Sequence, residues 1–423
     1  MTLFARSARS RLALAALAGM VPIVASCGTA PPADAPEPSP ATAATSETGA
    51  TAPPPPTSPS RLSDADRDQL NRDLIAASWA DDVPRAAALI DAGADVNFED
   101  ETQQSAFLIA ASEGYYDLLE LTLARGANLA ALDSYNGTAL IRAAERGHWD
   151  VCGRLIRAGI ALDHVNYSGW TALHEAVVYG DGRGDHLDTV RVLIAGGANL
   201  DIASTRAGAV PAEHAAAQGQ VDVERLLRAG PTWTLPDAAA AGDADAVAWA
   251  LRTGTDSEVR DEAGRTPLLL AVTNDRVPAA RVLTTLGADP NALDDRHDTP
   301  WLVTGVTGSV AMADVLLPAH PDLAIVNRFG GTSIIPASER GHVEYVRRIA
   351  GTGIDLDHVN YPGWTALLEA VVYGDGSARY QQVVAALLAA GADPAIPDAA
   401  GLTAHEHAVS RGQTEIATLL APG

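Results

Sequence analysis

Short apolar stripes, each followed by a glycine, recur along the chain from about residue 72 onwards. The stripe in residues 171–180 consists of Ala172, Leu173, Ala176 and Val177. Thr171 should begin this helix, because its hydroxyl can cap the first turn, and Gly180 should end it. A second stripe, made of Val151, Leu155 and Ile156, has the spacing of a helix with one buried face. The pattern predicts pairs of short antiparallel helices whose apolar faces no single pair can bury.

A hydroxyl residue opens most of these units at a spacing of 33 residues. These residues are Ser105, Thr138, Thr171, Thr266, Thr299, Thr332 and Thr365. Extending the count to weaker units gives eleven repeats, which open near residues 72, 101, 134, 167, 205, 231, 263, 295, 328, 361 and 399. We expect a polar helix at residues 63–71 to cap the first of them.

A longer duplication contains the shorter period. Residues 163–182 (DHVNYSGWTALHEAVVYGDG) return 194 positions later at residues 357–376 (DHVNYPGWTALLEAVVYGDG) with two differences. This offset matches repeats 1–5 with repeats 7–11 and leaves repeat 6 without a counterpart.

The period and two local motifs resemble those of ankyrin repeats. Residues 266–271 read TPLLLA and residues 287–291 read GADPN, close to the ankyrin pattern T-P-L-H-x-A followed by G-A-D-x-N. The chain is similar to ankyrin-repeat proteins over residues 72–423. This resemblance implies an all-α repeat solenoid of helix-turn-helix pairs with short β-hairpin loops.

The repeats divide into two blocks, residues 62–230 and 231–423. Repeat 5 ends at residues 228–230 without a G-A-D-x-N loop, and two prolines at positions 231 and 236 oppose helix continuation. The blocks are either hinged at residues 231–236 or joined in one curved array with a kink, and we favour the curved array.

Repeats 4 and 10 are longer than 33 residues. Their extra residues fall after the first helix, at 181–186 and 375–380, which predicts an inserted loop in both copies. The sequence RGD at residues 183–185 resembles an integrin-binding tripeptide. Its counterpart at residues 377–379 reads SAR, so we do not assign it that role.

The N-terminus has the pattern of a secretion signal. Three arginines precede an apolar run at residues 12–25 that is too short to span a bilayer. The run leads into Val-Ala-Ser-Cys at residues 24–27, which resembles a bacterial lipobox; the alternative is an ordinary signal peptide. We therefore expect a signal peptide at residues 1–26, a lipidated Cys27, a disordered Pro/Ala/Thr-rich linker at residues 27–61, and an extracytoplasmic lipoprotein anchored to the membrane.

The charge of the chain limits the kinds of partner it can bind, and its cysteines indicate whether a disulfide can form. The net charge of −24, with arginine as the only strongly basic residue type, argues against binding to nucleic acid or to anionic lipid. The second cysteine, Cys152, falls on the inner face of a predicted helix and should be a buried thiol without a disulfide partner.

The resemblance implies that partners bind the concave face, which is formed by hairpin tips and first helices. The candidate residues at these positions are Tyr167, Trp170, Glu175, Tyr179 and Asp181 in repeat 4, and Tyr361, Trp364, Glu369, Tyr373 and Asp375 in repeat 10. Three aromatic residues per site, in a chain that is 5% aromatic, suit a binding hot spot. Alternatively, the rings pack on the inserted loops. The acids either accept a cationic group, remain solvated or cap loop amides.

No motif in the sequence predicts catalysis. His405 and His407 are two residues apart on a predicted helix and do not face each other, so we do not expect a metal site. Phosphate-binding loops and nucleophile elbows are absent from the sequence. The sequence thus predicts a non-enzymatic, monomeric scaffold without a cofactor that binds a protein or peptide partner. The alternatives are a receptor for a cationic metabolite or cell-wall fragment, and an immunity or inhibitor protein against a secreted enzyme or toxin.

Overall fold

Most hydroxyl residues of the 33-residue period, and Thr403 of the last repeat, cap helix N-termini as the sequence predicts. In the computed structural model, which describes residues 63–421, their side chains accept hydrogen bonds from backbone N–H groups three residues further on. This holds for Ser105, Thr138, Thr171, Thr266, Thr299, Thr365 and Thr403. Each cap satisfies a donor that the first helical turn leaves unpaired.

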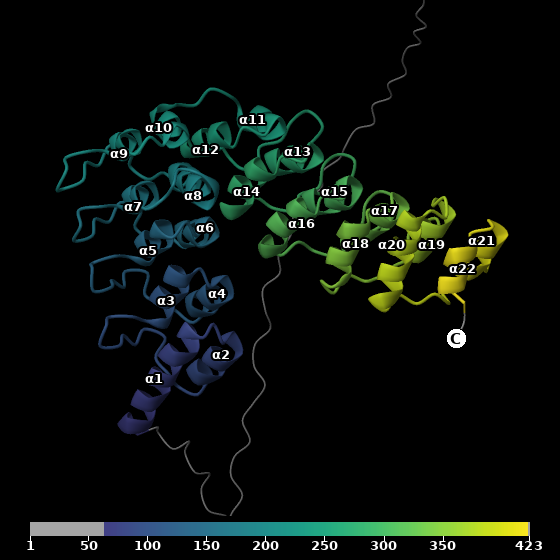
Figure 1. The fold of residues 1–423 in the computed structure, drawn as a ribbon, viewed down its shortest axis with the longest axis horizontal. Helices are drawn as coiled ribbons and strands as arrows, with labels where there is room; N and C mark the ends of the chain where they lie inside the picture. Colours follow the sequence, from purple (N-terminus) through teal and green to yellow (C-terminus); the bar gives the residue numbers. More distant parts are fainter. Residues whose placement is uncertain (1–62, 422–423) are drawn as a thin grey trace, which may run out of the picture. The chain divides into compact units, whose positions relative to one another are not determined.

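The described residues form helices joined by turns (Figure 1). The first block contains α1 (Asp64–Trp79), α2 (Val83–Asp91), α3 (Ala106–Glu113), α4 (Tyr116–Ala124), α5 (Ala139–Glu145), α6 (Trp149–Arg157), α7 (Ala172–Val178), α8 (Gly184–Ala195), α9 (Pro211–Ala217) and α10 (Val221–Arg228). The second contains α11 (Leu235–Ala241), α12 (Ala244–Arg252), α13 (Pro267–Thr273), α14 (Val277–Thr285), α15 (Pro300–Thr307), α16 (Val310–Leu316), the 3₁₀-helix η1 (Leu317–Ala319), α17 (Ile334–Glu339), α18 (Val343–Ala350), α19 (Ala366–Val372), α20 (Ala378–Ala389), α21 (Ala404–Ser410) and α22 (Thr414–Leu419).

The α-helices pair consecutively, which confirms the predicted eleven helix pairs of a repeat solenoid. Two boundaries differ from expectation. The predicted cap at residues 63–71 is not a separate helix, because α1 continues to Trp79 and serves as both the cap and the first helix of repeat 1. The predicted inserted loops at residues 181–186 and 375–380 are helical in their second half, since α8 and α20 begin at Gly184 and Ala378 and are 12 residues long.

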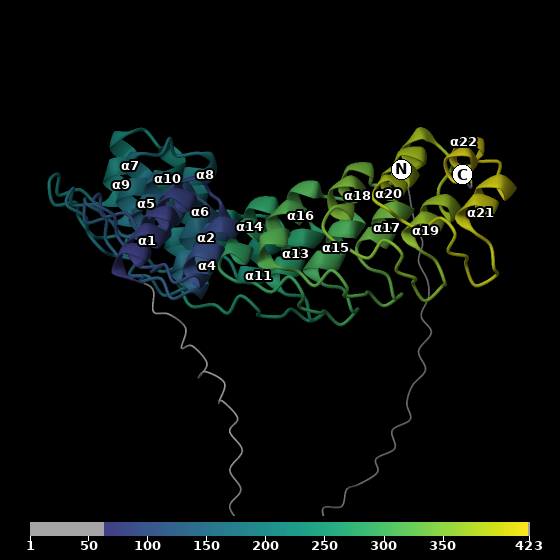
Figure 2. The ribbon, with the colours of Figure 1, turned by 90° about the horizontal axis from the view of Figure 1, so that it is seen from below.

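The loops of neighbouring repeats lie in a row along one side of the second block (Figure 2), and backbone hydrogen bonds join loop tips in both blocks. The backbone N–H of Tyr167 donates to the carbonyl of Tyr135 at 3.1 Å, and Tyr361 donates to Phe329 at 3.0 Å. Within residues 63–421 these loops form no regular β-strand, and Leu132 and Thr138 pair only as an isolated β-bridge. Hydrogen bonds between repeats, rather than paired strands, therefore align the loops.

One apolar cluster extends from Leu74 to Leu420. Its members include the second residue after each hydroxyl of the 33-residue series, where a large side chain is almost fully buried. These residues are Phe107, Leu140, Leu173, Leu268, Trp301, Ile334 and Leu367. Cys152 also lies in this cluster and is fully buried, as predicted. Each repeat thus completes the core of its neighbour.

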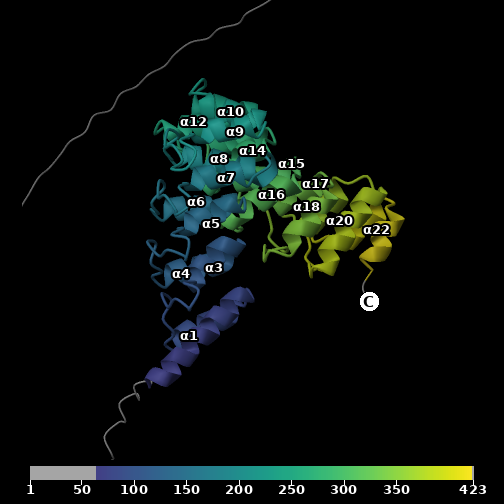
Figure 3. The ribbon, with the colours of Figure 1, turned by 60° about the vertical axis from the view of Figure 1, so that its left-hand side comes forward.

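The second block packs beside the first instead of simply continuing it (Figures 1 and 3). The helix α12 contacts α8 much more extensively than α10 does, although α10 belongs to the next repeat. The helix α14 contacts both α8 and α6. The join is therefore neither a bare hinge nor the simple kink that we favoured, because second helices of the two blocks form an interface.

Partly buried ion pairs lie in this interface. Asp188 of α8 binds Arg281 of α14 and, at 2.8 Å, Arg191, which in turn binds Asp245 of α12 at 2.7 Å. Arg252 of α12 donates to the carbonyl of Ala198 at 2.6 Å. These contacts connect repeat 4 of the first block with repeats 6 and 7 of the second and hold the two blocks together.

The predicted signal peptide, Cys27 and the linker lie outside the described residues. Between residues 63 and 421, every helix is too short or too polar to cross a membrane.

Candidate functional site

An asparagine at the base of each duplicated hairpin fixes the turn. Asn166 accepts a hydrogen bond from the backbone N–H of Trp170 at 3.0 Å, and Asn360 accepts one from Trp364 at 2.8 Å. Gly169 has φ of 84°, a left-handed conformation that glycine adopts without strain. The residue after each asparagine therefore lies at the tip of a well-defined turn.

Four tyrosines of the predicted sites face solvent. Tyr167 and Tyr361, at the hairpin tips, are 72% and 77% exposed. Tyr179 and Tyr373, which follow α7 and α19, are 59% and 58% exposed. A ring that stays in water gains little free energy from folding. Folding alone therefore does not explain why both copies have these rings.

The two tryptophans are half-buried and pack against the exposed tyrosines. The ring centroids of Trp170 and Tyr179 are 6.0 Å apart, and those of Trp364 and Tyr373 are 5.4 Å apart, both in edge-to-face geometry. Such pairs are favourable aromatic contacts. Each tryptophan therefore packs beneath an exposed tyrosine, and the tyrosines form the accessible part of each site.

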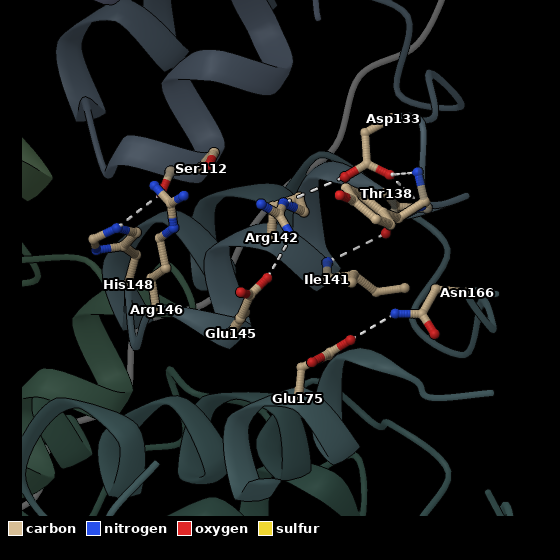
Figure 4. Close-up of polar contacts among 12 residues, drawn as sticks. Ser112, Asp133, Thr138, Ile141, Arg142, Glu145, Arg146, His148, Asn166 and Glu175 are labelled. Carbon is tan, nitrogen blue, oxygen red and sulfur yellow. Dashed lines mark hydrogen bonds and ion pairs between the residues drawn. The ribbon is translucent and has the colours of Figure 1, made fainter. Parts of the chain in front are cut away.

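Glu175 and Glu369 are not solvated, which excludes one of the three possibilities that the sequence leaves open for them. The two residues are only 4% and 5% exposed. The side-chain amide of Asn166 donates to Oε1 of Glu175 at 2.6 Å (Figure 4), and Asn360 donates to Glu369 at 2.7 Å. Each glutamate thus holds the asparagine that shapes its hairpin.

Burial changes the acidity of both glutamates. It raises the pKa of Glu175 and of Glu369 to about 7, against the opposing effect of the asparagine hydrogen bond. The Oε2 atom of each is buried and has no hydrogen-bond partner among the described residues. Neither carboxyl group is placed to receive a cation from a partner. Their position favours a role in orienting the hairpin.

Asp181 and Asp375 are the exposed acids of the two sites. Their carboxylates accept hydrogen bonds from the backbone N–H groups of Arg183 at 2.9 Å and Ser377 at 3.0 Å. The hydrogen bonds from Ser377 lower the pKa of Asp375. Both residues therefore shape the turn before the second helix and leave negative charge at the surface.

One set of positioning residues was missed by the sequence interpretation. In several repeats, a histidine or glutamine side chain after the first helix forms a hydrogen bond with a backbone carbonyl of the preceding repeat. The residues are His148, His186, Gln220, His342 and Gln413. The segment ERGH, identical at residues 145–148 and 339–342, was the available signal. It marks a connection between repeats.

The histidines at the C-terminal repeat bind different groups. His407 lies 2.8 Å from Asp398, and His405 lies 3.0 Å from the carbonyl of Ala417. Across the described part of the chain, no three histidine, cysteine or acidic side chains are grouped so that they could hold a metal ion.

Comparison with known proteins identifies the repeats. The family model described as ankyrin repeats (3 copies) matches residues 74–164, 107–204 and 302–398, and the model of a single ankyrin repeat matches residues 263–295. The chain belongs to the ankyrin-repeat family. Ankyrin repeats indicate a scaffold for protein–protein interaction, and ankyrin-repeat proteins are generally not enzymes.

Several ankyrin-repeat proteins resemble a little under half of this chain. The putative ankyrin repeat protein YahD of Escherichia coli (strain K12) is 39% identical over 184 residues, which cover 43% of this chain and 92% of YahD. A crystal structure of an ankyrin repeat domain from Acinetobacter baumannii AYE shows 45% identity, covers 44% of this chain and 95% of that domain, and has a TM-score of 0.43. Inversin from Canis lupus familiaris is 31% identical over 212 residues, 48% of this chain and 17% of inversin.

Proposed function

We propose that this ankyrin protein is a scaffold that binds a protein partner at two equivalent sites, one at Tyr167 and Tyr179 and the other at Tyr361 and Tyr373. The proposal depends on one observation: the two copies have tyrosine at the same two positions, and all four tyrosines are exposed. Buried residues of a duplicated repeat are constrained by packing, but exposed rings are not. Recognition of the same kind of surface at both sites explains their retention, and tyrosine is frequent in binding hot spots.

We further propose that Cys27 is lipidated and anchors the scaffold at the extracytoplasmic face of a bacterial membrane. The apolar run and the lipobox-like residues 24–27 support this location. Replacing Cys27 by serine should release the protein from the membrane fraction and abolish incorporation of labelled palmitate. Membrane retention of Cys27→Ser would contradict the anchor.

Burial of the two glutamates argues against the alternative function, a receptor for a small cationic ligand. That alternative needs carboxylates beside the rings, whereas Glu175 and Glu369 are enclosed and bonded to asparagines. A partner protein that covers exposed tyrosines does not need those carboxylates.

Affinity purification of the full-length protein from crosslinked native cells tests the scaffold. The double variant Tyr167→Ala with Tyr361→Ala should lose a protein that the wild type retains, because it removes the most exposed ring from each site. Trp79→Ala is the control, since Trp79 is an exposed aromatic residue at the end of α1, outside both sites.

The outcome is decided by comparing the three proteins. Loss of one partner from the tyrosine variant alone supports the scaffold. Equal recovery of every bound protein with the tyrosine variant and the wild type would rule out these two sites as its interface.

A further inference from the structure

A groove of about 390 Å³ lies on the hairpin and first-helix side of repeats 7–9. Its apolar floor comes from α13, α15 and α17 and consists of Leu269, Val303, Val306 and Pro336. Its sides include Arg265, Arg296, Arg328, Phe329 and Arg340. We call this surface the arginine groove. The lining also includes Asp294, Asp298 and Glu339, so its four arginines leave one net positive charge on a chain whose net charge is −24.

The same surface in the first block is occupied by an arginine. The duplication places Arg142 where the second block has Pro336. The guanidinium group of Arg142 lies 3.3 Å from the carboxylate of Asp133 and 2.5 Å from that of Glu145 (Figure 4). It therefore covers this part of the surface, and the two carboxylates neutralise its charge. Because Pro336 cannot make this bridge, the second block retains an open floor.

A second ion pair of the first block is also missing from the second. Arg146 pairs with Glu113, and the duplicate of this pair is Arg340 with Thr307. Thr307 cannot neutralise a guanidinium group. Arg296 corresponds to Thr102 and is an additional positive charge.

Two guanidinium groups are consequently available in the arginine groove. Arg265 and Arg328 are paired with Asp261 and Asp298. Arg296 and Arg340 are exposed, and neither has an ion pair or side-chain hydrogen bond with any residue of the described range. Guanidinium groups bind carboxylates in two-pronged geometry, and an apolar floor strengthens such contacts by excluding water.

We propose that the arginine groove binds a partner segment in which an apolar side chain is flanked by acidic residues. The apolar side chain would cover Val303 and Pro336, and the carboxylates would pair with Arg296 and Arg340. A single-stranded nucleic acid fits less well, because the floor is aliphatic and the rest of the chain is strongly acidic. The inference rests on the proposed scaffold function, but it concerns residues outside the two tyrosine sites.

Selection from a randomised 12-residue peptide library displayed on phage, with the full chain as bait, tests this inference. Peptides that combine acidic and apolar residues should be enriched. The best of them, made synthetically with a fluorescent label, should bind the wild type in anisotropy titrations. The double variant Arg296→Glu with Arg340→Glu should weaken binding by at least about tenfold, because each lost charged contact alone reaches that size.

Two further variants exploit the duplication. Pro336→Arg introduces the residue that the first block has at this position, where α5 is a stable helix, and should close the groove and weaken binding to a similar extent. Arg146→Glu is the matched control, because it reverses the corresponding charge in the first block and should leave binding unchanged.

Three results would overturn the inference. They are enrichment of peptides without acidic residues, unchanged affinity of Pro336→Arg, and binding of a 20-residue oligothymidine that requires Arg296 and Arg340. The tyrosine variants separate this inference from the proposed sites. If Tyr167→Ala with Tyr361→Ala retains the cellular partner but the groove variants lose it, the groove stands and the tyrosine sites do not.

Discussion

At the scale of single residues, Glu175 and Glu369 hold the aromatic hairpins in place, but burial of their carboxylates lowers the stability of the fold. Each accepts one hydrogen bond from an asparagine, while its second oxygen is buried without a partner in the described part of the chain. An ionised carboxylate in such surroundings is destabilised, which is why the pKa of both residues rises to about 7. The folded protein therefore binds these two protons more tightly than the unfolded chain does.

Replacing both glutamates by glutamine should stabilise the protein at alkaline pH. Because the folded pKa of about 7 exceeds the ordinary glutamate pKa of 4.5, wild-type stability falls as pH rises from 4.5 through 7 and stays lower above it. Glutamine keeps an oxygen for the asparagine and does not ionise. The gain should be on the order of 2 kcal/mol per site at pH 8 and near zero at pH 4. Thermal unfolding by circular dichroism across this range measures it.

The control for this prediction is Glu262→Gln, because Glu262 is exposed and its replacement should leave the pH profile unchanged. Parallel pH profiles of the wild type and the Glu175→Gln, Glu369→Gln variant would show that these carboxyl groups are not the source of the pH dependence.

Residue positions at the site were predictable only in part. The hairpin pattern correctly placed Tyr167 and Tyr361 at exposed tips. It did not reveal the burial of Glu175, because that depends on a contact with Asn166 of the hairpin and on cover from neighbouring repeats. Nine residues separate the two partners, and their spacing alone fits an exposed side chain equally well.

At the scale of elements, one hydroxyl of the 33-residue series does not cap a helix. In a regular helix the residue four positions after Thr332 would donate its N–H to the carbonyl of Thr332. That residue is Pro336, which has no N–H. Ile335 bonds that carbonyl instead at 3.1 Å, and α17 begins one residue late. The Thr332 hydroxyl is buried and unpaired among the described residues, whereas Thr266 accepts from the N–H of Leu269 at 3.2 Å.

This difference predicts opposite effects of the same substitution. Thr266→Val should lower the free energy of unfolding by about 1 kcal/mol, because it removes a helix cap. Thr332→Val should be neutral or stabilising, since it removes a buried hydroxyl that gains no hydrogen bond from the described residues. Urea unfolding of the two variants beside the wild type measures both effects. Equal destabilisation by the two substitutions would contradict the assignment of the caps.

The repeat pattern predicted the number and type of elements better than their ends. The glycines and aspartates at residues 180–185 indicated a loop, but Gly184 and Asp185 lie in the first turn of α8. Aspartate is favourable there because it faces unpaired N–H groups. The same residue types thus suit both a loop and a helix start.

At the scale of the whole repeat region, the two blocks form one unit through their second helices. Asp188 and Arg281, which join α8 to α14, are 93 positions apart in the sequence. The periodic pattern marks both helices as amphipathic and identifies the face toward their own repeats. It does not indicate a second contact on the opposite side, so the side-by-side packing could not be predicted.

Gly153 of α6 provides the most direct test of this packing. A Cβ atom at this position would lie 1.9 Å from Cγ2 of Thr285 and 2.8 Å from its carbonyl oxygen at the end of α14. Gly153→Leu should therefore separate the blocks, although leucine favours the helix itself. Faster proteolysis near residues 229–234 and a larger hydrodynamic radius, with unchanged helical content, should result. Gly230→Ala, which meets no atom within 4 Å, is the control. Identical proteolysis of Gly153→Leu and the wild type would mean that the blocks do not meet through α6 and α14.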